Sequence, residues 1–326
     1  MKRQSVFNTR LGYIYGLGSG LTWGLDTVLI GIAMAMAPFT ENPLLVVGGT
    51  FICSMFHDTF AAFWMLIIMG FRGRLKDLCK SIKTRDGLFC VLGALFGGPL
   101  AMTFYMLAIA KGGPALTATV TACYPLLGSA MAVVILKEKM SIRGWSGLFI
   151  CILGIIYIGY APFGEQNINI VGGIMLAAVA AIGWATESVV CGYGMKAGKI
   201  DPQMALLIRE VTSGTVYLLI VVPLMVGGYS DMLGGILTVF SYFPAWGTLF
   251  VTAFVGISSF FMWYTAIDSI GAARALCLNV TYSFWAVVFT FVFIGGALSL
   301  NIIIGSVMVV AGVATATLVT RKFNNK

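Results

Sequence analysis

Six ionisable side chains stand inside stretches of the chain that are otherwise apolar: Asp26, His57, Asp58, Glu187, Arg209 and Glu210. An ionised group removed from water is costly unless it is paired, so each of these residues is a candidate functional residue. Four carboxylates and one arginine leave a net charge of −3 with a neutral histidine, and −2 with a charged one. At least two acids therefore need a proton or a visiting cation, which suits a carrier of protons and organic cations.

Spacing along the chain indicates which of these groups meet. Glu187 precedes a turn near residue 198 by 11 residues and Arg209 follows it by 11, so at 1.5 Å per residue both lie at similar depth. Asp26 and His57 flank a turn near residue 40 in the same way. We therefore expect a Glu187–Arg209 ion pair and an Asp26–His57 contact. A histidine beside a carboxylate can move a proton at physiological pH. Coupling or gating is assigned to the set Asp26, His57, Asp58, Arg209 and Glu210.

Aromatic residues accompany the acids at helical spacing. Trp23 and Trp184 each stand three residues before an acid, so each shares a helix face with it. Aromatic faces attract quaternary ammonium groups, by about 0.5–1 kcal/mol when exposed and about 2 kcal/mol or more when desolvated. The predicted substrate-binding residues are Trp23, Tyr124, Trp184, Glu187, Asn279, Tyr282 and Trp285, with Tyr105 and Trp263 as weaker candidates.

The sequence is also consistent with purely structural roles for the same residues. Trp and Tyr are common in membrane proteins as packing residues and interfacial belts. Glu187 and Arg209 could form a purely structural salt bridge, Asp26 an interface hydrogen bond, and His57 a satisfied core contact. For Arg209 and Glu210, we favour a structural role in gating over direct contact with the substrate.

The elements that position these residues are predicted to be membrane helices. The chain is 59% hydrophobic and 10% charged, whereas soluble domains carry about 25% charged residues. A spanning helix needs about 20 apolar residues. Ten such segments fit, at about 11–35, 44–70, 87–110, 114–136, 144–161, 171–195, 203–226, 244–267, 273–294 and 299–320. Pro125 predicts a kink or break in the fourth of them.

The positions of the basic residues predict the orientation. With the N-terminus inside, every lysine and arginine except Lys111 and Arg209 falls in a cytoplasmic segment. Both termini are then cytoplasmic, in a bacterial-type cytoplasmic membrane, and the net charge of +8 requires no nucleic-acid partner. The seven cysteines are odd in number and form no CxxC, so neither a disulfide framework nor a metal site is expected, and no cofactor is implied.

An internal repeat relates the two halves of the chain. The stretch TWGLDTVLIG (22–31) aligns with GWATESVVCG (183–192), which matches Trp23 with Trp184 and Asp26 with Glu187. Tyr124 matches Tyr282 in a second aligned stretch, and His57-Asp58 can be laid over Arg209-Glu210. Five helices per repeat is an odd number, so residues 1–161 and 162–326 form two inverted repeats. The expected fold is all-α, with ten transmembrane helices and a substrate site near the midplane.

These motifs resemble the drug/metabolite transporter superfamily, specifically its EamA-type members with two five-helix repeats. The stretches AIGWATESVVCGYGM, ALLIREVTS and FMWYTAIDSIGAARALCLNVTYSFWAVVF look like bacterial choline importers of the LicB type. The resemblance implies uptake of a small quaternary ammonium by alternating access, driven by a proton or by the membrane potential. The partners it implies are a small organic cation, the lipid bilayer and H⁺.

Two other functions remain to be weighed. Export of amino acids, amines or amphiphilic metabolites is the alternative within transport. A membrane enzyme would need a nucleophile with a base, or a set of metal ligands, and the sequence has a single histidine and no HExxH motif. The chain also lacks the phosphate-binding motif GxxxxGK[ST] of an ATP-driven pump. The sequence therefore predicts a secondary transporter and not an enzyme.

Overall fold

Helices are the regular elements of the computed structural model, which describes residues 2–158, 170–196, 200–295 and 300–317. The first half contains α1 (Lys2–Met34), α2 (Ala37–Glu41), α3 (Pro43–Phe71), α4 (Leu75–Ile82), α5 (Arg85–Leu95), the π-helical turn η1 (Phe96–Leu100), α6 (Ala101–Thr121), α7 (Tyr124–Ile135) and α8 (Ile142–Ile158). The second half contains α9 (Ile170–Lys196), α10 (Pro202–Val216), the π-helical turn η2 (Tyr217–Val221), α11 (Val222–Val226), α12 (Tyr229–Phe240), α13 (Phe243–Ile270), α14 (Ala272–Asn279), α15 (Tyr282–Phe293) and α16 (Leu300–Thr317).

Within the described ranges, seven helical stretches are long and apolar enough to cross a membrane. They are Thr9–Met34, Pro43–Phe71, Arg85–Gly112, Val171–Lys196, Pro202–Val226, Phe243–Ile270 and Ala272–Phe293. Three further apolar helices are shorter: Tyr124–Ile135, Ile142–Ile158 and Leu300–Ala316. Seven of the ten segments predicted from the sequence match these long stretches, and the described parts of the other three lie mostly on helix. The chain is thus an all-helical, multi-pass membrane protein.

The helix break predicted at Pro125 is present one turn earlier than the proline itself. Helix α6 ends at Thr121 and α7 begins at Tyr124, so Pro125 lies in the first turn of α7. Proline suits that position because its missing N–H has no helical partner there in any case. A matching break separates α14 from α15 at residues 280–281, where the sequence has no proline. Tyr124 and Tyr282 therefore each begin a half-helix.

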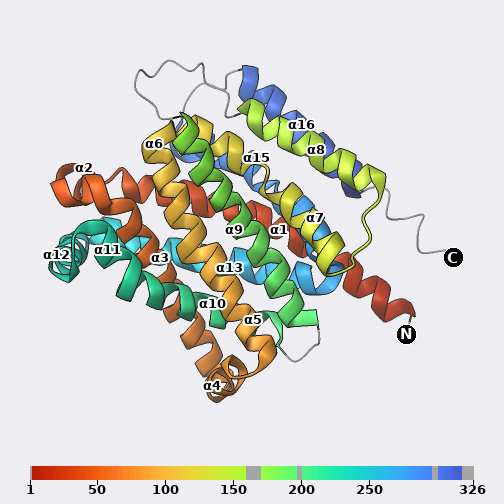
Figure 1. Ribbon diagram of the computed structural model, residues 1–326, viewed down its shortest axis with the longest axis horizontal. Helices are drawn as coiled ribbons and strands as arrows, with labels where there is room; N and C mark the ends of the chain where they lie inside the picture. Colours follow the sequence, from red (N-terminus) through yellow and green to blue (C-terminus); the bar gives the residue numbers. More distant parts are fainter. Residues whose placement is uncertain (1, 159–169, 197–199, 296–299, 318–326) are drawn as a thin grey trace.

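Segments far apart in the sequence pack along one another. Helix α1 packs on α13, α6 on α9 and α3 on α10, while α8 and α16 form a pair at one edge of the molecule (Figure 1). Glycines on α1 allow the half-helices to approach closely, because a Cβ on Gly20 would lie 2.1 Å from Oγ1 of Thr281. A Cβ on Gly24 would lie 2.6 Å from Cβ of Trp285. This approach brings Trp23 to the Tyr282 ring, with ring centroids 6.2 Å apart.

The first half of α10 is buried inside the protein. The run Met204–Ile208 is buried, and the charged residues that follow it, Arg209 and Glu210, are 4% and 0% exposed. The largest buried cluster contains residues of α10 together with residues of α9, α13 and α14. The six intramembrane ionisable residues are therefore held inside the protein and away from lipid.

Candidate functional site

A cavity of about 310 Å³ lies among α1, α3, α6, α9, α10 and α13. Five ionisable side chains line it: Asp26, His57, Asp58, Glu187 and Arg209. Eight aromatic rings face it as well: Trp23, Tyr105, Tyr124, Trp184, Tyr217, Phe260, Trp263 and Tyr282. Both π-helical turns reach its wall, through Gly97 and Tyr217. Such turns often occur at functional sites because they displace side chains from the regular helical positions.

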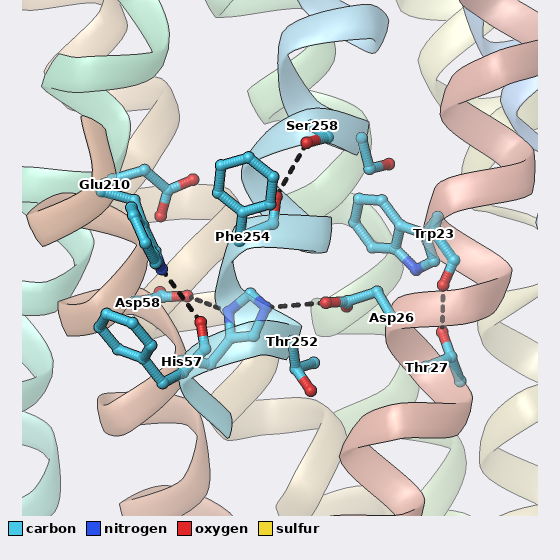
Figure 2. A network of polar contacts seen from close by, with 12 residues as sticks. Trp23, Asp26, Thr27, His57, Asp58, Glu210, Thr252, Phe254 and Ser258 are labelled. Atoms are coloured by element: carbon cyan, nitrogen blue, oxygen red, sulfur yellow. Dashed lines mark hydrogen bonds and ion pairs between the residues drawn. The ribbon is translucent and has the colours of Figure 1, made fainter. Parts of the chain in front are cut away.

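His57 lies between two carboxylates (Figure 2). Its Nε2 is 3.0 Å from Oδ1 of Asp26, and its Nδ1 is 3.0 Å from Oδ1 of Asp58. A neutral imidazole has a single N–H donor, and an ionised carboxylate only accepts. The arrangement therefore requires either a doubly protonated imidazole or one protonated carboxyl. In both cases these three residues hold one proton more than a neutral imidazole between two ionised carboxylates would.

Glu187 and Arg209 form the ion pair expected from their depths. Nε of Arg209 lies 3.3 Å from Oε1 of Glu187. The Tyr264 hydroxyl donates to the same oxygen at 3.1 Å. The guanidinium carbon also lies 4.0 Å from the centroid of the Phe260 ring, at cation–π distance. One arginine therefore occupies both a carboxylate and an aromatic face within the cavity.

Arg209 also connects Glu187 to Asp58 and Glu210. Its NH1 lies 2.9 Å from Oε2 of Glu210 and 3.5 Å from Oδ1 of Asp58. Ser213 donates to the other oxygen of Asp58 at 2.5 Å. Glu210 Oε1 is buried without a hydrogen-bond partner among the described residues. The polar contacts run unbroken from Asp26 through His57, Asp58 and Arg209 to Glu187.

A second polar chain crosses the wall of the cavity at the helix breaks. The Tyr124 hydroxyl donates to Oδ1 of Asn279 at 3.1 Å, and Nδ2 of Asn279 donates to Ser19 at 3.0 Å. Ser259 in turn donates to the backbone oxygen of Ser19 at 2.9 Å. Tyr124 lies at the start of α7 and Asn279 at the end of α14, so the chain joins the two interrupted helices.

The predicted aromatic residues differ in where they lie. Trp184 contacts Tyr105 and Tyr124, with ring centroids 5.3 and 5.7 Å apart. Trp285 does not line the cavity: its Cβ lies against Gly24, and its ring packs edge-on against Phe284 and at a tilt against Phe289. The break at 280–281 also places Asn279 and Trp285 on different helices, α14 and α15.

Several polar or aromatic contributors were not singled out from the sequence, among them Tyr264, Phe260, Ser213 and Tyr217. Tyr264 directly follows Trp263, so its position beside a predicted aromatic residue was an available signal. Phe260 is one of 23 phenylalanines, and its type alone carries no information. Among the described residues, no group of three or more His, Cys, Asp or Glu is placed to hold a metal ion.

Comparison with known proteins identifies relatives that are membrane transporters. The model of the EamA-like transporter family matches residues 10–160 and again residues 171–318. Protein LicB of Haemophilus influenzae is 27% identical over 279 residues, covering 85% of this chain and 87% of that protein. The uncharacterized transporter YyaM of Bacillus subtilis is 24% identical over 286 residues, covering 82% and 84%. One solved crystal structure shares the fold, with a TM-score of 0.72 at 18% identity over 96% of this chain and 98% of the other.

Proposed function

Because the chain belongs to the EamA-like transporter family, we propose that it imports choline or a related small quaternary ammonium compound across the cytoplasmic membrane. Family membership makes it a transporter and not an enzyme. We infer the substrate class from the cavity, which combines carboxylates with aromatic faces.

The observation that carries the proposal is the combination of Glu187 with aromatic faces in one buried cavity. Trp184 lies one helical turn before Glu187 on α9, and Tyr124, Tyr105 and Trp23 face the same space. A trimethylammonium group binds through cation–π contacts and charge attraction, both of which strengthen in a desolvated site. Asn279 and Tyr124 are placed to bind the hydroxyl of choline, since both line the cavity.

Two inverted repeats supply the proposed alternating access. The family model matches twice, which supports boundaries near residues 1–161 and 162–326. Each half sets the acid of its first helix against the cation of its second, as Asp26–His57 at 3.0 Å and Glu187–Arg209 at 3.3 Å. Ten spans in two halves of opposite topology can rock about the site between them.

The three residues Asp26, His57 and Asp58 are the proposed proton-binding group. They already share this additional proton and border the same cavity as Glu187. Both chain termini are proposed to be cytoplasmic, following the distribution of lysine and arginine.

Uptake of radiolabelled choline into proteoliposomes tests the proposal. We expect uptake by the wild type, and a loss of at least tenfold in Glu187→Gln and Trp184→Ala. Trp285→Ala is the matched control, because it removes a tryptophan outside the cavity and should retain uptake. Imposed pH gradients and membrane potentials then separate the two driving forces. Absence of choline uptake by the wild type, or normal uptake by Glu187→Gln, would reject the proposed substrate site.

A further inference from the structure

Arg209 contacts two carboxylates of the cavity: Glu187, which lies near Trp184, and Asp58, which lies beside His57. Its Nε lies 3.3 Å from Glu187, and its NH1 lies 3.5 Å from Asp58. Glu210 binds the same NH1 at 2.9 Å, so a single guanidinium charge is divided among three carboxylates. The guanidinium is buried, with 5% of the side chain exposed, and water screens these contacts very little.

We propose that Arg209 couples occupancy of the amine site at Glu187 to the proton held by Asp26, His57 and Asp58. The inference rests on the proposed function for the identity of the ligand. The coupling itself follows from the shared guanidinium and needs no particular amine.

The physical reason is competition for one positive charge. An organic cation beside Glu187 neutralises that carboxylate and repels Arg209, which shifts the arginine charge toward Asp58 and Glu210. A positive charge closer to Asp58 makes the proton on the neighbouring imidazole less favourable. Amine binding and protonation of His57 therefore oppose each other, and by linkage each weakens the other by the same factor. A proton held by His57 is then released as the amine binds and does not itself drive uptake of the amine.

The groups that face His57 from neighbouring elements are consistent with weaker protonation of His57 when the amine is bound. Asp26 reaches it from α1, and Asp58 is its own neighbour on α3. Arg209 and Glu210 approach from α10 through Asp58. Helix α13 contributes Gly256, where a Cβ would lie 2.6 Å from Nε2 of His57. In this set Arg209 is the permanent cation, and its position determines the field at the imidazole.

His57 is the only histidine in the chain, so its ring can be observed directly. Purified protein with a tag free of histidine, labelled with ¹⁵N-histidine, gives one pair of ring signals that report the doubly protonated fraction at fixed pH. Glu187→Gln imitates the neutralised carboxylate. We expect it to lower the ratio of doubly to singly protonated imidazole at least threefold at the pH where the wild type is half protonated.

A double-mutant cycle assigns the effect to Arg209. The change caused by Glu187→Gln should fall below half its size when Arg209 is replaced by Gln. Asp58→Asn breaks the same path on the other side of the arginine, and it serves if the arginine variant does not fold. Trp285→Ala is the control, because it changes a side chain outside the cavity and should leave the ratio within a factor of two of wild type.

The outcomes separate the coupling from the substrate assignment. An unchanged ratio in Glu187→Gln, or an equal change with and without Arg209, overturns the coupling. Choline added to wild type should lower the ratio in the same direction as Glu187→Gln. If Glu187→Gln acts as expected and choline does not, the coupling stands and the proposed substrate is wrong.

Discussion

Glycine at position 97 is what gives the Glu187 carboxylate room in the cavity wall. A Cβ on Gly97 would lie 1.7 Å from Oε2 and 2.2 Å from the carboxyl carbon of Glu187. Gly97 lies in the π-helical turn η1, which begins directly before it and contains Pro99. The carboxylate and the turn therefore depend on each other: the acid fits only where the facing helix presents a bare backbone.

We predict that Gly97→Ala displaces Glu187 and reduces choline uptake by at least tenfold. Displacement breaks the contacts from Arg209 and Tyr264, and a hydrogen bond to a charged group is worth about 1.5–3 kcal/mol. The thermal midpoint of the purified protein should fall with it. Gly31→Ala is the matched control, because a Cβ at that position of α1 meets nothing within 4 Å. Equal uptake by the two alanine variants would show that Glu187 does not need its observed position.

The contacts between charged residues could be predicted from the sequence, because so few charged residues occur in apolar helices. Counting residues from the turns indicated the pairs Glu187–Arg209 and Asp26–His57, and both contacts are present. The aromatic residues were less predictable, since their helical phase depends on which neighbour packs against them. Gly24 lets α1 lie against Trp285, so this tryptophan is directed away from the cavity, while Phe260 faces it.

At the scale of whole elements, α14 is held by a residue from a distant loop. Glu138 accepts hydrogen bonds from the backbone N–H groups of Ala272 and Ala273, both at 2.9 Å. Lys137 adopts a left-handed conformation with φ of 56°, which turns the chain after α7 toward this helix. Gly271 has φ of 89°, and a Cβ there would lie 2.7 Å from the Glu138 carboxylate. An acid at a helix start is favoured by the unpaired N–H groups and by the helix dipole.

We predict that Glu138→Ala lowers the free energy of unfolding by about 0.5–2 kcal/mol, the usual value of a lost N-cap. The expected effect is a lower thermal midpoint in detergent, with choline affinity changed less than stability. Lys139→Ala, a change beside it in the same loop, should leave the midpoint near that of wild type. A stability effect of the same size in Lys139→Ala would show that the loop, and not the cap, is responsible.

Asp201 connects the start of α10 to the segment after α3. Its carboxylate accepts from the backbone N–H of Gln203 at 3.1 Å and from Arg74 at 2.5 Å. Burial alone would raise the pKa of this carboxyl, but the hydrogen bonds from Arg74, Met204 and Gln203 together lower it. Since the pKa is lower in the folded protein than in the unfolded chain, the stabilisation is present above the unfolded value. It disappears as the pH falls through the folded value.

The pH dependence of Asp201→Asn therefore has a definite sign. We predict that the variant is less stable than wild type at pH 7, and that the difference shrinks as the pH falls below about 4, near the ordinary pKa of aspartate. Asparagine still caps the helix, so the comparison isolates the charge. Thermal unfolding of both proteins across this pH range measures it. A difference that does not change with pH would mean that the charge contributes nothing.

The helices themselves were largely predictable, and their interruptions were not. Apolar length determines where a chain can span, so the predicted segments largely coincide with helices. Pro125 marked one break, whereas the break at 280–281 has no proline and follows from packing against α1. Helix α12 was not predicted either, because its apolar run is too short to resemble a span.

At the scale of the whole molecule, polar contacts join the two halves at one end of the bundle. Arg74 binds Asp201 there, Arg72 binds Gln203, and Glu138 caps α14. Lys196 at the end of α9 donates to the backbone oxygen of Leu136 at 2.8 Å. The cavity instead extends toward the opposite end, where Met34 ends α1 and Thr50 lies near the start of α3. With the proposed orientation, the cavity lies nearer the outside of the membrane than the cytoplasmic side.

Cys53 offers a direct test of access to the cavity from the outside, because it lines the cavity between Thr50 and His57. In protein carrying Cys79→Ser and Cys123→Ser, we predict that a thiosulfonate reagent bearing a trimethylammonium group, added outside, modifies Cys53 and blocks uptake. Choline should protect the thiol, since the reagent imitates the proposed substrate and must use the same space. Cys53→Ser in the same background should be insensitive. The exposed Cys79 on α4 should react in wild type only from the cytoplasmic side. Modification of Cys53 exclusively from that side would contradict the proposed orientation or access from the outside.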